Sequence, residues 1–173
     1  MKRLQQLNKR TLIIAALLVV AGIVVAGAGV SRIILDSNAQ VNQTAKDGTS
    51  PEFRALLPAA TSIDDLGGWN KQTSPGGEVY FVFLDTINTT TIRVSQQELP
   101  ESLQKNTSTS IAELAKGYNA NRTLDVGNTK VFIGINTKGQ QSIIFTRNSL
   151  LVLIVSEQTI PDDAWTQYIE NLR

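Results

Sequence analysis

The chain has 173 residues, of which 42% are hydrophobic, and its formal net charge is +1. It contains no cysteine and no histidine, which excludes zinc fingers, disulfides, thiol nucleophiles and a histidine general base. From Asp36 onward acidic residues outnumber basic ones by 15 to 11, and such a body is a poor match for nucleic acid. We therefore expect no nucleic-acid partner, no metal and no cofactor.

An uninterrupted apolar segment from Leu12 to Val30 predicts a transmembrane helix. At ~1.5 Å per residue a helix of this length spans ~28 Å, close to the ~30 Å hydrocarbon thickness of a bilayer. The residues before it, 2–10, carry four cations, whereas Arg32 is the one charge soon after it. This bias predicts a cytoplasmic N-terminus and an extracytoplasmic C-terminal part, with the segment in the plasma (inner) membrane.

A cleaved signal peptide is the competing interpretation of the same segment. Residues 26–28 read Ala-Gly-Ala, which has the small-x-small form of a cleavage site. The apolar region is longer than the ~7–15 residues usual in a signal peptide, which favours a retained anchor. The predicted organisation is a basic cytoplasmic N-terminus (1–11), a transmembrane helix (12–35), a flexible linker (36–50) and an extracytoplasmic domain (51–173).

The first half of the predicted domain combines helix-type and strand-type patterns. The run PEFRALLP, residues 51–58, predicts a short helix with proline at its first position. Residues 79–84 are apolar on both alternating sides, which predicts a central buried strand. Residues 90–97 alternate instead, and this pattern predicts an exposed edge strand that ends before Pro100. Ser110 and Glu113 have capping-box spacing ahead of a helical apolar pattern, which predicts a helix starting there.

The C-terminal third predicts a β-meander followed by a helix. Residues 130–136, 140–146 and 149–157 are short β-type runs with turn residues between them. Leu150 to Val155 is far shorter than the ~20 residues of a membrane-spanning helix, so it is expected to be a buried strand. Trp165, Tyr168, Ile169 and Leu172 then recur at helical spacing.

The predicted fold class is therefore α+β: an N-terminal transmembrane helix followed by an antiparallel-sheet domain with a C-terminal helix packed on the sheet. Because the central strands are apolar on both faces and the helices are few, part of one face is expected to be covered by a partner. That partner is a second copy of the chain or another envelope protein.

Several of these motifs resemble a family of uncharacterised single-pass membrane proteins from bacteria with reduced genomes. They are LGGW (66–69), IRVSQQELPESL (92–103), VFIGINTKGQQSIIF (131–145), SLLVLIVS (149–156) and DDAWTQYIENL (162–172). The meander with its final helix also resembles, more loosely, small extracytoplasmic domains of unknown function. The resemblance implies a location and a fold, and it carries over no catalytic residue.

Ser102 and Lys105 match the S-x-x-K pattern of penicillin-binding enzymes. The companion S-D-N motif is missing, and residues 137–139 read TKG where KTG is required. A small envelope serine hydrolase is therefore the less favoured alternative, and these two residues are expected to lie in water after Pro100. The acidic pairs at 64–65 and 162–163 are expected to cap helices rather than to bind calcium.

Two glutamine pairs, Gln96-Gln97 and Gln140-Gln141, lie on or beside predicted strands. Neighbouring strand residues point to opposite faces, so one amide of each pair is expected to bond backbone groups and the other to face solvent or a partner. A recognition edge that binds by strand addition is the site hypothesis, with these candidate residues: Trp69, Arg93, Gln97 and Gln140. The functional interpretation is a membrane-anchored, non-enzymatic domain that binds a partner protein or an envelope component.

Overall fold

The computed structural model describes residues 50–74 and 76–173. The predicted transmembrane helix and nearly all of the predicted linker, residues 12–49, lie outside this range. Across the described ranges, no helix is both long enough and apolar enough to cross a bilayer.

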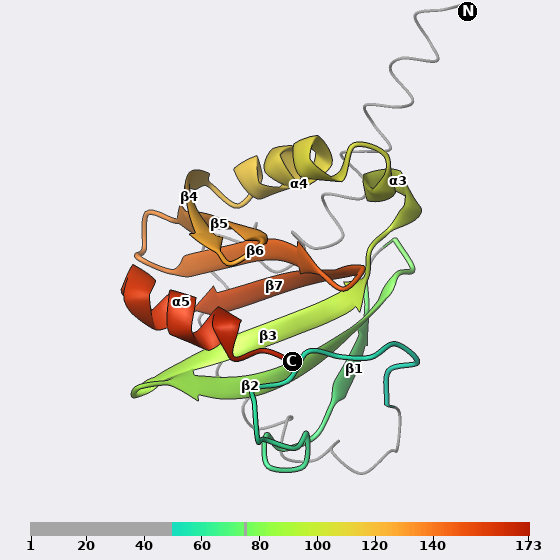
Figure 1. The fold of residues 1–173 in the computed structure, drawn as a ribbon, viewed down its shortest axis with the longest axis vertical. Coiled ribbons are helices and arrows are strands. Elements are labelled where there is room, and N and C mark those ends of the chain that lie inside the picture. Colours follow the sequence, from blue (N-terminus) through green and yellow to red (C-terminus); the bar gives the residue numbers. More distant parts are fainter. Residues whose placement is uncertain (1–49, 75) are drawn as a thin grey trace, which may run out of the picture.

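One antiparallel sheet of seven strands forms the body of the domain, with strand order β1-β2-β3-β7-β6-β5-β4 (Figure 1). The helices lie on the sheet or connect its strands. In chain order the elements are β1 (Asn70–Thr73), β2 (Val79–Ile87), β3 (Thr90–Glu98), α3 (Glu101–Gln104), α4 (Thr107–Lys116), β4 (Ala120–Val126), β5 (Thr129–Ile135), β6 (Gln141–Arg147), β7 (Leu150–Ser156) and α5 (Asp162–Glu170). The predicted α+β class, the antiparallel sheet and the C-terminal helix are confirmed.

The apolar run Leu150–Val155 lies in β7, at the middle of the sheet. β7 pairs with β3 on one side and with β6 on the other, and its side chains are buried on both faces apart from the half-buried Val155. The predicted meander of β5, β6 and β7 is likewise confirmed. A strand in this position needs apolar side chains on both faces, which explains why its sequence does not alternate.

The prediction that residues 90–97 form an edge strand is wrong. β3 pairs with β2 and with β7, so it is internal. Its polar residues suggested solvent, but Ser95, Gln96 and Gln97 are all buried. The true edges are β1 and β4, two strands that the sequence patterns did not reveal because one is short and the other is rich in polar residues.

The two faces of the sheet carry separate hydrophobic cores. We call them the α5 face and the α4 face after the helix that packs on each. The core of the α5 face contains Ile92, Val94, Ile143 and Val152 from the strands and Trp165 from the helix. On the α4 face, Ile144, Leu151 and Leu153 pack with Ile111 and Leu114 of α4.

Helix α5 forms as predicted, with Trp165 and Ile169 buried in the core. A cation from another element lies at its C-terminal end. Arg147 of β6 donates from Nη1 to the carbonyl oxygens of Ile169 (2.7 Å) and Leu172 (3.3 Å). A guanidinium there satisfies terminal carbonyls and complements the helix dipole, so Arg147 stabilises the C-terminal end of α5.

Helix α4 is confirmed, but its predicted capping box is not. The helix begins at Thr107, so Ser110 lies inside it and donates from Oγ to the Lys105 carbonyl at 3.2 Å. Glu113 pairs with Lys116 on the helix surface instead of capping. The apolar periodicity therefore located the helix, while the local capping signal misplaced its start by one turn.

Residues 51–57 are not the predicted helix. Their backbone is held by Gln96, whose Oε1 accepts from the Leu56 N–H at 2.8 Å and whose Nε2 donates to the Leu56 carbonyl at 2.6 Å. A side-chain amide thus occupies both backbone groups that a helix would use. Beyond this clamp, Pro58 forms an antiparallel bridge with Leu172, which ties the start of the domain to its C-terminus.

We predict that Gln96→Met lowers the free energy of unfolding by about 2–4 kcal/mol, because two buried backbone groups of Leu56 lose their partners at ~1–3 kcal/mol each. Urea unfolding of the full chain in detergent measures it. The matched control is Gln97→Met, on the same strand with its side chain on the opposite face, and it should cost about 1 kcal/mol or less. Equal losses in the two variants would contradict the clamp.

Candidate functional site

The helices cover only one half of the α4 face. Helix α4 lies against β4, β5 and β6, and α3 lies against α4. The other half is formed by β1, β2 and β3, and Figure 1 shows these strands extending beyond α4. We call it the β1–β3 patch and define it by six of the side chains that strand pairing places on that face, two of them buried (Val82 and Gln97) and four half-buried (Gln72, Tyr80, Leu84 and Arg93).

Three polar side chains meet in the β1–β3 patch, one from each strand. Gln72 Oε1 accepts two hydrogen bonds, one from the Tyr80 hydroxyl at 2.7 Å and one from Arg93 Nη2 at 2.7 Å. Burial lowers the pKa of the Arg93 guanidinium, and the neighbouring Tyr80 partly offsets this. Arginine keeps its charge in proteins, so the patch holds a partly desolvated cation whose partner here is a neutral amide.

A second tyrosine lies near this group. Tyr118, just past α4, is buried, and its hydroxyl has no hydrogen-bond partner within the described residues. Burial raises the pKa of Tyr118, and Tyr80 raises it further, so the two phenols are close enough for their charges to interact. The end of α4 approaches the sheet closely because Gly134 has no side chain. A Cβ at that position would lie 2.1 Å from the Tyr118 carbonyl oxygen.

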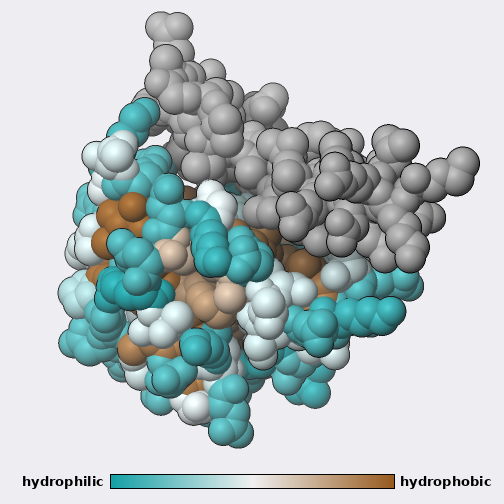
Figure 2. Space-filling view, turned by 90° about the horizontal axis from the view of Figure 1, so that it is seen from above, coloured by the Kyte–Doolittle hydropathy of each residue, from teal (hydrophilic) through white to brown (hydrophobic). Residues whose placement is uncertain are grey.

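The chemistry available in the β1–β3 patch is recognition by hydrogen bonds and charge. Arg93 has donors beyond the one given to Gln72, whereas the Tyr118 hydroxyl is buried and is not exposed to a ligand on the patch. Half-buried Leu84 supplies apolar surface beside Arg93, whereas Val82 is buried. Figure 2 shows the molecule from above, looking towards α4, and on that side hydrophobic residues are interleaved with hydrophilic ones. Among the described residues, no group of three acidic side chains could hold a metal ion.

The structure brings together two of the four predicted partner-surface residues. Arg93 and Gln97 lie four positions apart on the same face of β3. Trp69 lies on the opposite face, where its ring meets those of Phe81 and Phe83 edge-on at 6.0 and 5.4 Å. Gln140 is at the turn before β6, where its amide donates to Glu157 at 2.6 Å. Strand addition at β3 is excluded because both its edges are already paired.

Ser102 and Lys105 do not form a catalytic arrangement. Both are exposed, and within the described residues no hydrogen bond joins their side chains. Ser102 lies in the four-residue helix α3, and Lys105 follows it in extended conformation. The acidic pairs serve the backbone or an ion pair, since Asp65 accepts from Ser62 and Asp162 pairs with Arg122.

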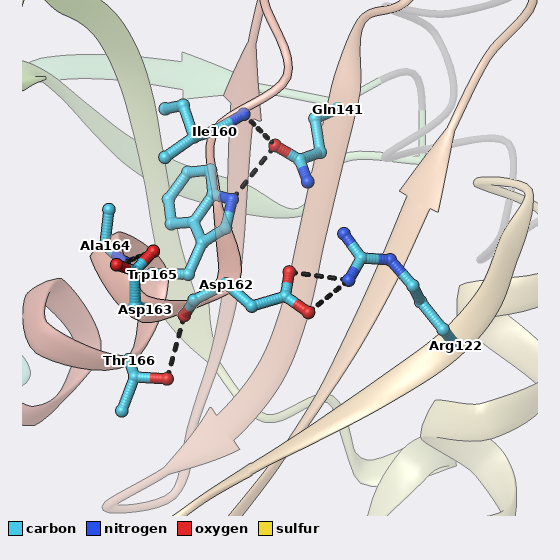
Figure 3. Close-up of polar contacts among 8 residues, drawn as sticks. All are labelled: Arg122, Gln141, Ile160, Asp162, Asp163, Ala164, Trp165 and Thr166. Atoms are coloured by element: carbon cyan, nitrogen blue, oxygen red, sulfur yellow. Dashed lines mark hydrogen bonds and ion pairs between the residues drawn. The ribbon is translucent and has the colours of Figure 1, made fainter.

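A buried amide on the α5 face organises the other polar contact of the domain (Figure 3). Gln141 Oε1 accepts from the Ile160 N–H at 2.8 Å and from the Trp165 indole at 2.9 Å. Its Nε2 is turned away from both and has no partner in the described part of the chain. Nearby, Arg122 of β4 pairs with Asp162 at the start of α5. These contacts fix the helix on the sheet. The prediction named neither member of the pair, and Gln141 is the one that bonds a backbone group.

Gln72, Tyr80 and Tyr118 are site residues that the sequence patterns did not indicate. Tyr80 lies within an apolar run, where a tyrosine is expected to pack in the core and nothing indicates a polar contact of its hydroxyl. Gln72 lies in the short strand β1, which was not predicted. The one available signal was Arg93, a charge in a strand whose other face is apolar.

Together, fold and site define an α+β domain with one helix-covered sheet face and one face only half covered. No protein-family model matches the sequence, and neither a curated protein nor a solved structure matches the chain.

We predict that the three tyrosines ionise abnormally. Burial raises the pKa of Tyr80, Tyr118 and Tyr168 above the ordinary value of 10.0, and Asp85, which accepts a hydrogen bond from Tyr168, raises the latter further. The unfolded chain therefore loses these protons first. Stability is fully present below pH ~10 and falls as the pH rises above it. Ultraviolet tyrosinate absorbance, with and without urea, measures the difference.

Two phenylalanine variants separate the roles of the hydroxyls. Tyr168→Phe removes a hydrogen bond of 2.9 Å to Asp85 and should cost about 1 kcal/mol at neutral pH. Tyr118→Phe removes a hydroxyl without a partner in the described residues and should cost nothing or stabilise. A large loss from Tyr118→Phe would mean that this hydroxyl is already satisfied.

Proposed function

We propose that this chain is a membrane-anchored, non-enzymatic extracytoplasmic domain that binds a partner protein through the β1–β3 patch. The proposal rests on the hydrogen bonds that join Gln72 to Tyr80 and to the charged side chain of Arg93. This group lies on the part of the sheet where α3, α4 and α5 do not make their main contacts. Partly desolvated arginine and tyrosine side chains are typical anchors of protein interfaces.

The anchor is the second part of the proposal. It rests on the apolar segment Leu12–Val30 and on the cations that precede it. A domain tethered in this way meets envelope proteins at a high local concentration, so a modest interface suffices for binding. The alternative of a domain released by signal-peptide cleavage predicts a mature chain that starts near Gly29, which intact mass distinguishes.

The topology is testable because the chain has no cysteine. We predict that Ser108→Cys, on the exposed surface of α4, is labelled by a membrane-impermeant maleimide on intact cells. A matched variant in the N-terminal stretch, Gln5→Cys, should be labelled only after lysis. The reverse pattern, or full-length protein in the aqueous fraction, would contradict the anchor and its orientation.

The binding surface is testable by site-specific photo-crosslinking in native membranes. We predict that a photoreactive residue at Leu84, in the patch, gives a discrete adduct with another protein. The control is the same residue at Lys71, which is exposed on β1 with its side chain on the opposite face. Adducts of equal yield at both positions, or none at Leu84, would argue against binding through the patch.

A further inference from the structure

Strand β4 ends the sheet at the side opposite the β1–β3 patch, and its outer edge is open. In the described sheet β4 pairs with β5 alone, and Figure 1 shows it far from β1. The other edge, β1, has four residues and carries the exposed Lys71, and both features block pairing at an edge. β4 has seven residues. Its one bulge lies between Ala120 and Arg122, which leaves the rest of the strand regular.

The turn that joins β4 to β5 determines which backbone groups point outwards. It has two residues between the pair Val126 and Thr129, and its first residue, Gly127, has the positive φ of 56° that a type II′ hairpin turn needs. The pair beside such a turn is hydrogen-bonded, and hydrogen-bonded and non-hydrogen-bonded pairs then alternate along the hairpin. The backbone N–H and C=O of Thr123 and Asp125 therefore point away from β5. Both residues are exposed.

We propose that β4 pairs antiparallel with β4 of a second copy of this chain, so that the two sheets join into one. In this pairing the backbone of Thr123 in each copy exchanges both hydrogen bonds with Asp125 of the other. Leu124 then lies opposite Leu124 of the second copy. Leu124 is half-buried and packs against the core of the α5 face, so the second leucine extends that core across the junction.

The charges on β4 favour this register over its neighbours. Sliding the strands in one direction places Asp125 opposite its own copy, and sliding them in the other direction eventually places Arg122 opposite its own copy. Like charges directly opposite each other are destabilising. The remaining register, with Thr123 opposite Thr123, would pair Asp125 with Asn121, a residue that lies in the bulge and has no partner in β5. Bulged residues are irregular templates for pairing.

A second copy also suits the proposed anchor. The twofold axis that relates two antiparallel strands of one sheet is perpendicular to the sheet, so it keeps the α5 faces of both copies on the same side. The segment after the predicted linker packs on that face through Leu56. Both chains therefore approach the joined sheet from one side, as expected for two chains anchored in one membrane. Two short strands make a small interface, so we expect it to need the high local concentration that a shared membrane provides.

The test uses two versions of the full, cysteine-free chain, one with Thr123→Cys and the other, differently tagged, with Asp125→Cys, produced together in native membranes. The Cα atoms of a hydrogen-bonded pair lie ~5.5 Å apart, which suits a disulfide, so we expect mild oxidation to link the two versions. Each version alone should link far less, because diagonal neighbours lie ~7–8 Å apart. The control Ser108→Cys, exposed on α4, should stay unlinked.

A second measurement tests the backbone pairing itself. Leu124→Cys alone should link two copies, because its pair lies on the twofold axis. Adding Thr123→Pro should slow this link about tenfold or more, since it removes an outward N–H from both copies. The ladder with β5 should stay intact, because proline is tolerated where the N–H faces solvent. The matched Thr123→Val keeps the N–H and should keep the link.

Three results would overturn the pairing: single versions that link as readily as their mixture, no disulfide in either experiment, or a Leu124→Cys link that Thr123→Pro leaves unchanged. The pairing goes beyond the proposed function and lies at the opposite edge of the sheet. The Leu84 photo-adduct therefore tests the patch separately, whichever result is found here.

Discussion

The pairing of β3 with β7 holds this domain together. The chain builds two local units, the hairpins of β1–β3 and the meander of β4–β7, and in the described sheet these two strands are where the units join. The register aligns residues 92–98 with 150–156, far apart in sequence. The hydrophobic core of the α5 face contains residues of both strands, so packing on that face depends on this junction. Pairing between strands so far apart in sequence has a high loop-closure cost, so its stabilising contacts form late in folding.

Polar side chains lie inside this junction and pin the covering elements. Gln96 of β3 holds the backbone of Leu56, and Gln141 of β6 holds Ile160 and the Trp165 indole. A buried amide is costly unless it is hydrogen-bonded, so the Gln96 amide and the Gln141 oxygen find their partners only when the covering element sits in one position. Burial of the glutamines therefore specifies where the N-terminal segment and α5 lie, more than it adds stability.

This arrangement also separates what the sequence predicts from what it does not. The strand β7 and the helix α5 follow from apolar periodicity, which is a local signal. The edge assignment of β3 failed because Arg93, Ser95 and Gln97 look solvated, and whether a polar strand lies at an edge depends on which strand pairs beside it. That neighbour, β7, lies more than fifty residues later.

The predicted helix at 51–58 failed for the same reason. Its propensity was overridden by one side-chain amide, a tertiary contact that no local pattern records. The candidate site behaves likewise: Arg93 and Gln97 could be named, whereas Gln72 and Tyr118 join them only through the fold. Trp69 was named as part of the recognition edge because it follows two glycines in a turn, where an exposed side chain is expected. Its ring packs against the hydrophobic core instead.

The two sheet faces differ in a way that bears on binding. The α5 face is closed by both ends of the domain, since the segment after the linker and the C-terminal helix pack on it and are tied by the bridge from Pro58 to Leu172. Displacing either would expose Trp165 and its neighbours, at a cost comparable to the whole stability of a domain. The β1–β3 patch carries no such penalty, because its polar group is held by strands that are paired already. A ligand can therefore be exchanged there without unfolding anything, which is the physical requirement for reversible recognition.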